Sequence, residues 1–308
     1  MHEQIKAALR GVLQRAELPF AEQELLAMHT TFRIGGPAAF WCAPQDVEQL
    51  RQTLKCCKDQ GVRVYLLGNG SNTLFADEGF DGAVVDLRGI APSVTATEQA
   101  DTVLLTAGAG MTLGRLCAEA QQRALAGLEF ACGIPGTVGG AMYMNAGAYG
   151  GEMKDVVAWV SFLDDNLNLR TLPASELQMG YRTSIFEKNP SWCIVSACVR
   201  LQKGDGAEIL AQMQEYLERR RSKQPLEWPS AGSTFKRPQG AFAGRLIEDC
   251  GLRGYTVGGA QISEKHCGFV INKGGATCAD VVALTDDVKR IVYEKTGFVL
   301  EREIRVVK

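Results

Sequence analysis

The stretch Gly133–Gly151, GIPGTVGGAMYMNAGAYGG, places seven glycines among nineteen residues. Glycine lacks a Cβ, so it permits positive φ angles and lets another backbone or a ligand approach closely, at a cost in chain entropy. Successive N–H groups in such a turn form a concave binding site for an anion, and turns of this kind after a strand often bind dinucleotides. The stretch is therefore a candidate phosphate-binding turn, although most glycine-rich turns are only turns.

A second candidate turn, Gly68–Asn72, follows the apolar run Val62–Leu67. Neither turn has a strict nucleotide-binding fingerprint. Thr73 stands where the dinucleotide motif has its third glycine, and the chain has no Gly-Lys-Ser/Thr of a P-loop. Two such turns, each joined to apolar strands, could nevertheless hold the two phosphates and the ring system of an extended dinucleotide such as FAD.

Length and charge narrow the class of protein. The 308 residues exceed the usual size of one hydrophobic core, which predicts two or three domains. The net charge of -2, with acidic and basic residues interleaved, argues against a general nucleic-acid or anionic-membrane surface. The charged N-terminal stretch lacks the apolar core of a secretory signal, and no run approaches the roughly 20 apolar residues of a membrane span. We therefore expect a cytoplasmic protein with no membrane partner.

The ten cysteines are scattered through apolar segments of a chain long enough to fold without disulfides. We interpret them as reduced core residues. There is no Cys-x-x-Cys pair, and with only three histidines the sequence offers no recognisable set of metal ligands. We expect no tightly bound metal.

Apolar runs alternate with amphipathic segments, which indicates a mixed α+β fold. Helices are predicted at 45–60, 113–123, 207–223 and 279–295, and strands at 62–67, 84–87, 103–107, 159–163, 169–172, 194–201 and 299–307. We predict a two-lobed FAD-binding region, with a small α/β lobe at 1–88 and a sheet-rich lobe at 89–203. An α/β substrate-binding domain at 204–308 would follow, and its last strand, at about 299–308, could pack back on the FAD lobes.

Short motifs occur in a defined order along the chain. They are HTTFRIGGP (29–37), LGNGSNTL (67–74), the 133–151 stretch, YRTSIF (181–186), AGSTFKRP (231–238), GRLIEDCG (244–251), GGA (258–260) and LEREIR (300–305). In this order the sequence resembles the UDP-N-acetylenolpyruvoylglucosamine reductases, and in particular the shorter class that lacks an extra tyrosine-bearing loop. The resemblance covers about residue 29 to the end.

The resemblance implies non-covalent FAD, reduced by NADPH, which passes hydride to the enolpyruvyl group of UDP-N-acetylglucosamine enolpyruvate and so yields UDP-N-acetylmuramate for peptidoglycan. The implied FAD-binding residues are Thr31, Arg33, Gly68, Asn69, Gly70, Ser71, Asn72, Gly133, Pro135, Gly136, Thr137, Gly139, Gly140, Asn145, Ala146 and Gly147. The implied substrate-binding residues are Tyr181, Lys236, Arg237 and Lys265.

Such a reaction needs a group that stabilises negative charge on the substrate carboxylate and a positioned proton donor. Arg182 suits the first task, because a guanidinium is always charged and can grip a carboxylate through two hydrogen bonds. Its alternative is pairing with a surface acid. Ser233 is the candidate donor to carbon, and its alternative is bonding within a turn.

Glu303 is the third candidate catalytic residue. Period-two geometry in a final strand would send Glu301 and Glu303 to the same face, so either could reach the site. We choose Glu303 because it precedes an Ile-Arg pair that resembles the end of the family's sequences. Its carboxyl group could polarise the intermediate or relay a proton, and the alternative is an exposed charge on an edge strand.

Two other functions stay open at this stage. One is an FAD-dependent oxidase of the same broad architecture, although Ser71-Asn72 offers neither a His nor a Cys for covalent flavin attachment. The other is a nucleotide sensor without chemistry. We expect a monomer in every case.

Overall fold

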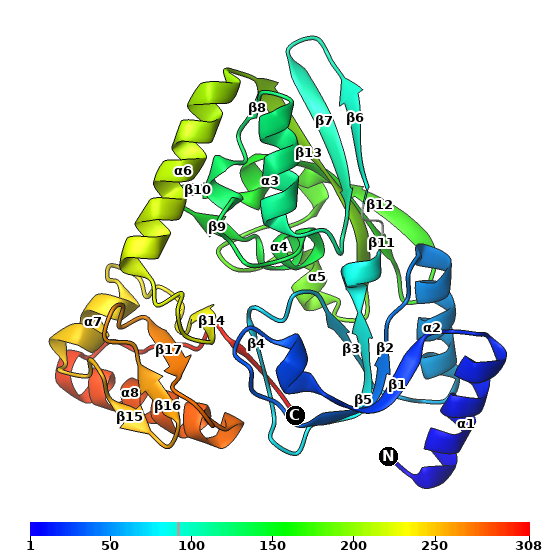
Figure 1. Ribbon diagram of the computed structural model, residues 1–308, viewed down its shortest axis with the longest axis horizontal. Helices are drawn as coiled ribbons and strands as arrows, with labels where there is room; N and C mark the ends of the chain where they lie inside the picture. The colour runs from blue at the N-terminus through cyan, green and yellow to red at the C-terminus, as the bar shows by residue number, and fades with distance from the viewer. Residues whose placement is uncertain (91–92) are drawn as a thin grey trace. The chain divides into compact units, whose positions relative to one another are not determined.

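The computed structural model describes residues 1–90 and 93–308 and divides into two compact units that alternate along the chain (Figure 1). The first unit contains 1–21, 41–69 and 82–219; the second contains 22–40, 70–81 and 220–308. The sequence-based division at 88 and 203 is a different partition, and it stays a prediction. The expected α+β class is confirmed.

Helices occur in both units. The α-helices are α1 (Glu3–Arg15), α2 (Val47–Asp59), α3 (Leu113–Gln122), α4 (Val138–Met144), α5 (Ile185–Lys188), α6 (Gly206–Lys223), α7 (Ala243–Asp249) and α8 (Cys278–Thr296). Short 3-10 turns are η1 (Leu26–His29), η2 (Leu87–Gly89), η3 (Glu129–Ala131), η4 (Met153–Asp155) and η5 (Ala174–Glu176).

The strands of the early chain are β1 (Phe20–Leu25), β2 (Pro37–Cys42), β3 (Val64–Leu67), β4 (Thr73–Phe75), β5 (Phe80–Asp86), β6 (Val94–Glu98), β7 (Thr102–Gly108), β8 (Leu125–Ala126) and β9 (Gly147–Ala148). The later strands are β10 (Gly151–Glu152), β11 (Val157–Leu163), β12 (Leu169–Pro173), β13 (Cys193–Lys203), β14 (Ser230–Ser233), β15 (Thr256–Val257), β16 (Ala260–Ile262), β17 (Phe269–Asn272) and β18 (Arg305–Val307).

The first unit is built around an antiparallel sheet in the order β12-β11-β13-β7-β6, with β8 pairing with the far end of β13. Its core consists of inward-facing residues of the central strands, such as Leu105, Val160 and Val199, together with the buried faces of α3 and α4. In the same unit β3 pairs in parallel with β5, with Leu67 opposite Asp86. This pairing places the end of β3, and therefore the start of the Gly68 turn, at the end of β5.

The second unit contains an antiparallel sheet in the order β14-β17-β16-β15, and α8 packs on β15 and β16 (Figure 1). Helix α8 forms where the sequence predicts it, because its signals are local. Thr277 and Asp280 form a capping box at its start, and Gly297 ends it with a positive φ of 75°. Its apolar face, which includes Val281, Leu284 and Val288, is fully buried.

The predicted final strand at 299–307 is wrong over most of its length. Only Arg305–Val307 form a strand, β18, which pairs in parallel with β4. The preceding segment makes an antiparallel bridge between Arg302 and Phe235, in which the N–H of Glu303 donates to Thr234 and the N–H of Lys236 donates to Glu301, each at 2.8 Å. The period-two argument assumed a continuous strand, whereas Glu301 and Glu303 flank one isolated bridge at Arg302, so their placement on one face stays a prediction. The pairing with β4 joins the chain's end to residues within the predicted first lobe.

All ten cysteines are free thiols, eight of them buried. Burial raises the pKa of the Cys193 thiol to about 12, which keeps it protonated at neutral pH. The eight buried thiols are core side chains, as the sequence predicts, whereas Cys56 and Cys132 are half-buried. Within 1–90 and 93–308, the helices are all too short or too polar to cross a membrane.

Candidate active site

The first predicted turn begins in the first unit. After β3, Gly68 packs so closely on Thr137 that a Cβ would lie 2.5 Å from its Oγ1. The side-chain amide of Asn69 donates to the carbonyl of Pro135 at 2.7 Å. The structure therefore brings the start of the Gly68 turn against the Gly133–Gly140 turn, as expected if both belong to one ligand site.

The rest of this turn belongs to the second unit. Gly70 has a φ of 60°, and a Cβ there would lie 2.3 Å from the carbonyl oxygen of His29, so only glycine fits. The Gly70 carbonyl accepts a hydrogen bond from the N–H of Thr31 at 3.3 Å. The Ser71 hydroxyl makes no hydrogen bond within the described part of the chain. It is therefore available to a ligand.

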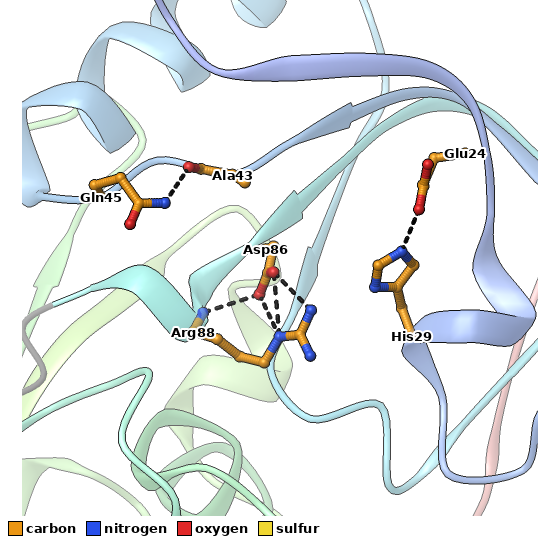
Figure 2. Close-up of polar contacts among 6 residues, drawn as sticks. All are labelled: Glu24, His29, Ala43, Gln45, Asp86 and Arg88. Atoms are coloured by element: carbon orange, nitrogen blue, oxygen red, sulfur yellow. Dashed lines mark hydrogen bonds and ion pairs between the residues drawn. The ribbon is translucent and has the colours of Figure 1, made fainter.

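The segment around Thr31 ties this turn to the sheet of the second unit. The hydroxyl of Thr31 donates to the carbonyl of Ser230 at 2.7 Å. His29 forms a 2.7 Å contact with Glu24 (Figure 2). Arg33 is exposed and has a φ of 55°. Thr31 thus braces the turn through protein contacts, and its predicted role as a flavin contact, like that of Arg33, stays a prediction.

In the first unit the Gly133–Gly140 turn leads into helix α4. Thr137 caps this helix, accepting from the N–H of Gly140 at 3.3 Å. Gly139 is a packing residue, because a Cβ there would lie 2.9 Å from that of Ala109. The N–H groups of Gly133 and Gly136 have no hydrogen-bond partner among the residues that the structure describes. Free N–H groups beside a helix start suit phosphate oxygens, so this turn fits FAD.

The end of α4 has a different role. Asn145 is completely buried and adopts the left-handed conformation, with φ 43° and ψ 58°. Its amide donates to the carbonyl of Gly180 at 2.9 Å and to the carboxylate of Glu152, and its oxygen accepts from the N–H of Lys154 at 2.9 Å. Ala146 follows, with its N–H donating to Ala141.

Arg182 lies in a tight turn closed by two hydrogen bonds between Gly180 and Thr183. Its φ of 56° is in the left-handed region. The guanidinium donates to the carbonyl of Gly147 at 3.3 Å and lies 5.1 Å from the centre of the exposed Tyr181 ring. Both contacts leave the guanidinium half-buried and oriented, which suits a carboxylate clamp.

Ser233 ends β14 in the second unit, opposite Phe269 and next to Gly232, whose φ is 75°. Its side chain is exposed, and its hydroxyl makes no hydrogen bond within 1–90 or 93–308. The neighbouring carbonyl of Thr234 accepts from the N–H of Glu303 at 2.8 Å. The structure thus brings the backbones of two predicted catalytic residues, Ser233 and Glu303, side by side. Glu301, the alternative to Glu303, is exposed and pairs with Lys236 at 3.3 Å.

The predicted substrate-binding cations already have protein contacts. Lys236 pairs with Glu301, and Arg237 lies 3.9 Å from the centre of the Phe242 ring. Lys265 donates to the carbonyl of Arg221 at 2.8 Å, in the last turn of α6. A diphosphate would have to compete with these exposed contacts.

Two electrostatic features lie close to the predicted residues. Burial lowers the pKa of His266, whose Nδ1 accepts from the N–H of Gly268 at 3.0 Å. In the first unit Asp86, at the end of β5, accepts hydrogen bonds from Arg88 that raise the pKa of that guanidinium (Figure 2). His266 is half-buried, and its ring lies 5.0 Å from that of Phe269 in β17.

Sequence reasoning missed the side chains that hold the Arg182 turn, namely Ser184 and Glu152. The hydroxyl of Ser184, which is fully buried, donates to the carbonyl of Tyr143 at 2.8 Å. A signal for Ser184 was present in the Tyr-Arg-x-Ser spacing. No local signal marks Glu152.

Two family models match the chain, one in its earlier part and one in its later part. The C-terminal domain of UDP-N-acetylenolpyruvoylglucosamine reductase matches residues 224–307, and an FAD binding domain matches residues 38–171. The reductase of Lachnoclostridium phytofermentans is 46% identical over 284 residues, 92% of this chain and 91% of the relative. That of Clostridioides difficile is 44% identical over 306 residues, 99% of this chain and 98% of the relative.

The chain belongs to the UDP-N-acetylenolpyruvoylglucosamine reductase family. Among solved structures, the reductase of Thermus caldophilus matches with a TM-score of 0.75 and 34% identity, over 94% of this chain and 99% of that one. The resemblance inferred from the motifs is therefore confirmed, and so is FAD as the cofactor of this reductase family member.

Proposed function

We propose that this reductase uses NADPH and FAD to reduce the enolpyruvyl group of UDP-N-acetylglucosamine enolpyruvate, forming UDP-N-acetylmuramate for peptidoglycan synthesis. The observation that carries the proposal is similarity to named reductases over almost the whole chain, in both the FAD-binding and the C-terminal parts. FAD, when bound and reduced, supplies the hydride to the enolpyruvyl double bond.

FAD-binding roles are proposed for the residues of the two turns. Gly133, Gly136 and Thr137 would direct N–H groups to the phosphates in the first unit, and Ser71 would offer its hydroxyl in the second. Gly68, Gly70 and Gly139 allow the close packing of these turns, because an added Cβ at each would lie within 3 Å of a neighbouring atom. The remaining predicted residues other than Asn145, among them Pro135, Gly140 and Ala146, would line the FAD site.

Arg182 is proposed to stabilise charge on the substrate carboxylate. Hydride addition to the vinyl carbon leaves electron density next to this carboxylate, and a fixed guanidinium lowers the energy of that state more than that of the substrate. The hydrogen bond from Arg182 to the carbonyl of Gly147 supports this role, because it orients the guanidinium group before substrate binds. Tyr181 would lie along the same substrate group.

Ser233 is proposed to give its proton to the carbon next to the carboxylate. A hydroxyl is a weak acid, but a carbanion-like intermediate is a strong base, so an aligned hydroxyl suffices. The exposed Ser233 hydroxyl makes no hydrogen bond with a described residue, which supports its availability. Glu303, whose backbone is bonded to the adjacent Thr234, would polarise the intermediate or relay the proton.

Lys236, Arg237 and Lys265 are proposed to bind the diphosphate of the sugar nucleotide. We also propose that the protein acts as a monomer in the cytoplasm, since its ten free thiols suit a reducing compartment. The three-part division at 88 and 203 is retained as a proposal for how the FAD and substrate regions are organised.

The test is consumption of NADPH by the purified holoenzyme with and without the enolpyruvyl sugar nucleotide. We expect substrate-dependent consumption and a product two hydrogens heavier than the substrate. A sensor would bind the nucleotide without turnover, and an oxidase would consume oxygen with an alcohol or sugar in place of NADPH. Either result would overturn the proposal.

A further inference from the structure

Within the first unit, the end of helix α4 and the residues after it form hydrogen bonds with the segment that carries Arg182. The carbonyl of Tyr143 accepts from the hydroxyl of Ser184 at 2.8 Å. The side chain of Asn145 donates to Gly180 at 2.9 Å, and the carbonyl of Gly147 accepts from Arg182 at 3.3 Å. The second half of the glycine-rich stretch therefore supports the arginine.

Arg182 needs such support. Its φ of 56° lies in a region that residues with a Cβ populate at a cost in free energy. The turn from Gly180 to Thr183 is closed by two of its own main-chain hydrogen bonds, at 3.1 and 3.3 Å. A conformation of this kind persists where the surrounding structure determines it. The contacts from the end of α4 supply that constraint.

Asn145 is suited to supporting the turn that carries Arg182. Its residue is 0% exposed, and both protons of its amide are used, one by Gly180 and one by Glu152. Asparagine also tolerates the left-handed conformation that ends α4, where its φ is 43°. Because the amide has no proton left for a ligand, a direct donor role toward FAD does not fit the geometry.

We propose that Asn145 is a positioning residue for Arg182, holding the Gly180 carbonyl so that the guanidinium is fixed before substrate binds. The inference rests on the proposed role of Arg182 in stabilising the substrate carboxylate. Asp at this position would lose the donor to Gly180 and face the carboxylate of Glu152, so the amide is required.

The test separates the two half-reactions of the holoenzyme. In Asn145→Gly the left-handed backbone is retained and only the side chain is removed. We expect FAD content and flavin reduction by NADPH to stay at the wild-type level, while flavin oxidation by the enolpyruvyl substrate slows by roughly tenfold to a hundredfold, the scale of a misplaced catalytic group. Asp46→Ala is the matched control in the same unit. It removes the carboxylate that caps helix α2 by accepting a hydrogen bond from the N–H of Gln49 at 2.8 Å. It should lower the melting temperature without changing either rate.

A double variant supplies the decisive readout. If Asn145 acts through Arg182, Asn145→Gly adds no further loss to Arg182→Ala in substrate-dependent flavin oxidation. The inference would be overturned if the rate losses of the two single variants multiplied in the double variant. It would also be overturned if Asn145→Gly lost FAD affinity, or if its flavin were oxidised by substrate at the wild-type rate. If the reduced flavin of Arg182→Ala were oxidised by substrate at the wild-type rate, the proposed function of Arg182 would fail instead. Should Asn145→Gly not fold, Ser184→Ala removes the contact to Tyr143 and must show the same selective slowing.

Discussion

The side-chain amide of Asn72 donates a hydrogen bond to the main-chain carbonyl of Glu303 at 3.1 Å, across 231 positions of sequence. The carbonyl of Asn72 in turn accepts from the N–H of Arg305 at 3.0 Å. One residue of a predicted flavin turn therefore fixes the backbone on both sides of Ile304. This clamp holds the backbone at Glu303 and Arg305, just before and within β18.

Replacing Asn72 should affect both stability and rate. We expect Asn72→Ala to lower the free energy of unfolding by about 1 kcal/mol, the usual value of one hydrogen bond, and to slow substrate-dependent flavin oxidation because Glu303 is released. Gln121→Ala is the control, since Gln121 also donates a side-chain amide bond to a distant carbonyl, that of Gly206, at 3.2 Å and across 85 positions. Denaturant titration and rapid mixing measure the two effects. Equal rate losses in both variants would count against the clamp.

Arg182 gives a second prediction. Arg182→Ala should lower turnover by roughly 10²-fold to 10³-fold with FAD still bound, because it removes charge stabilisation and leaves the flavin turns intact. Arg182→Lys retains the charge without the planar fork, so it should recover only part of the rate. Steady-state kinetics and the flavin absorbance spectrum test this together. A colourless Arg182→Ala protein would show that the residue supports cofactor binding instead.

The contact between Gly68 and Thr137 predicts a steric effect. In Gly68→Ala the new Cβ would lie 2.5 Å from Thr137 Oγ1, so the turn must move. At an overpacking cost of about 1–3 kcal/mol, FAD affinity should fall by roughly tenfold to a hundredfold. Gly114→Ala is the control, because its Cβ would meet only the Cys132 carbonyl, at 3.5 Å, inside helix α3. Titration of the apoprotein with FAD measures the affinity of both variants. Unchanged affinity in Gly68→Ala would contradict the close contact between Gly68 and Thr137.

His266 predicts a pH dependence of stability. Burial lowers its pKa below the ordinary value of 6.5, so the unfolded chain binds the proton more tightly than the folded one. The stability of the folded state that depends on neutral His266 is therefore fully present above pH 6.5, and it is lost as the pH falls toward the lowered pKa of the folded state. His266→Gln keeps an acceptor for the N–H of Gly268 but does not titrate. Its free energy of unfolding should decline less than that of the wild type between about pH 8 and pH 5. Parallel declines would remove His266 as the cause.

Local signals account for what the sequence could predict. Helix α8 is marked by its capping box, its apolar face and Gly297, all within its own segment. The strand predicted at 299–307 failed because its main-chain partners, Phe235 and Asn72, lie far away in sequence. Periodicity carries no information about such partners.

The same distinction holds for the site. The motif that contains Arg182 could be found by resemblance, but its support could not. Asn145 and Gly180 are 35 residues apart, and only the structure shows that the asparagine faces the arginine's turn. For this reason sequence reasoning grouped Asn145 with the flavin residues.

The most direct test of the account is the reoxidation of NADPH-reduced holoenzyme by the enolpyruvyl sugar nucleotide, followed without oxygen by flavin absorbance in the wild type and in Ser233→Ala. We predict that both proteins bind FAD and are reduced alike, and that product formation and reoxidation in Ser233→Ala are slower by about 10²-fold or more. Reoxidation of Ser233→Ala at the wild-type rate would show that another group protonates the substrate. A wild-type protein whose reduced flavin does not respond to this substrate would contradict the proposed reaction itself.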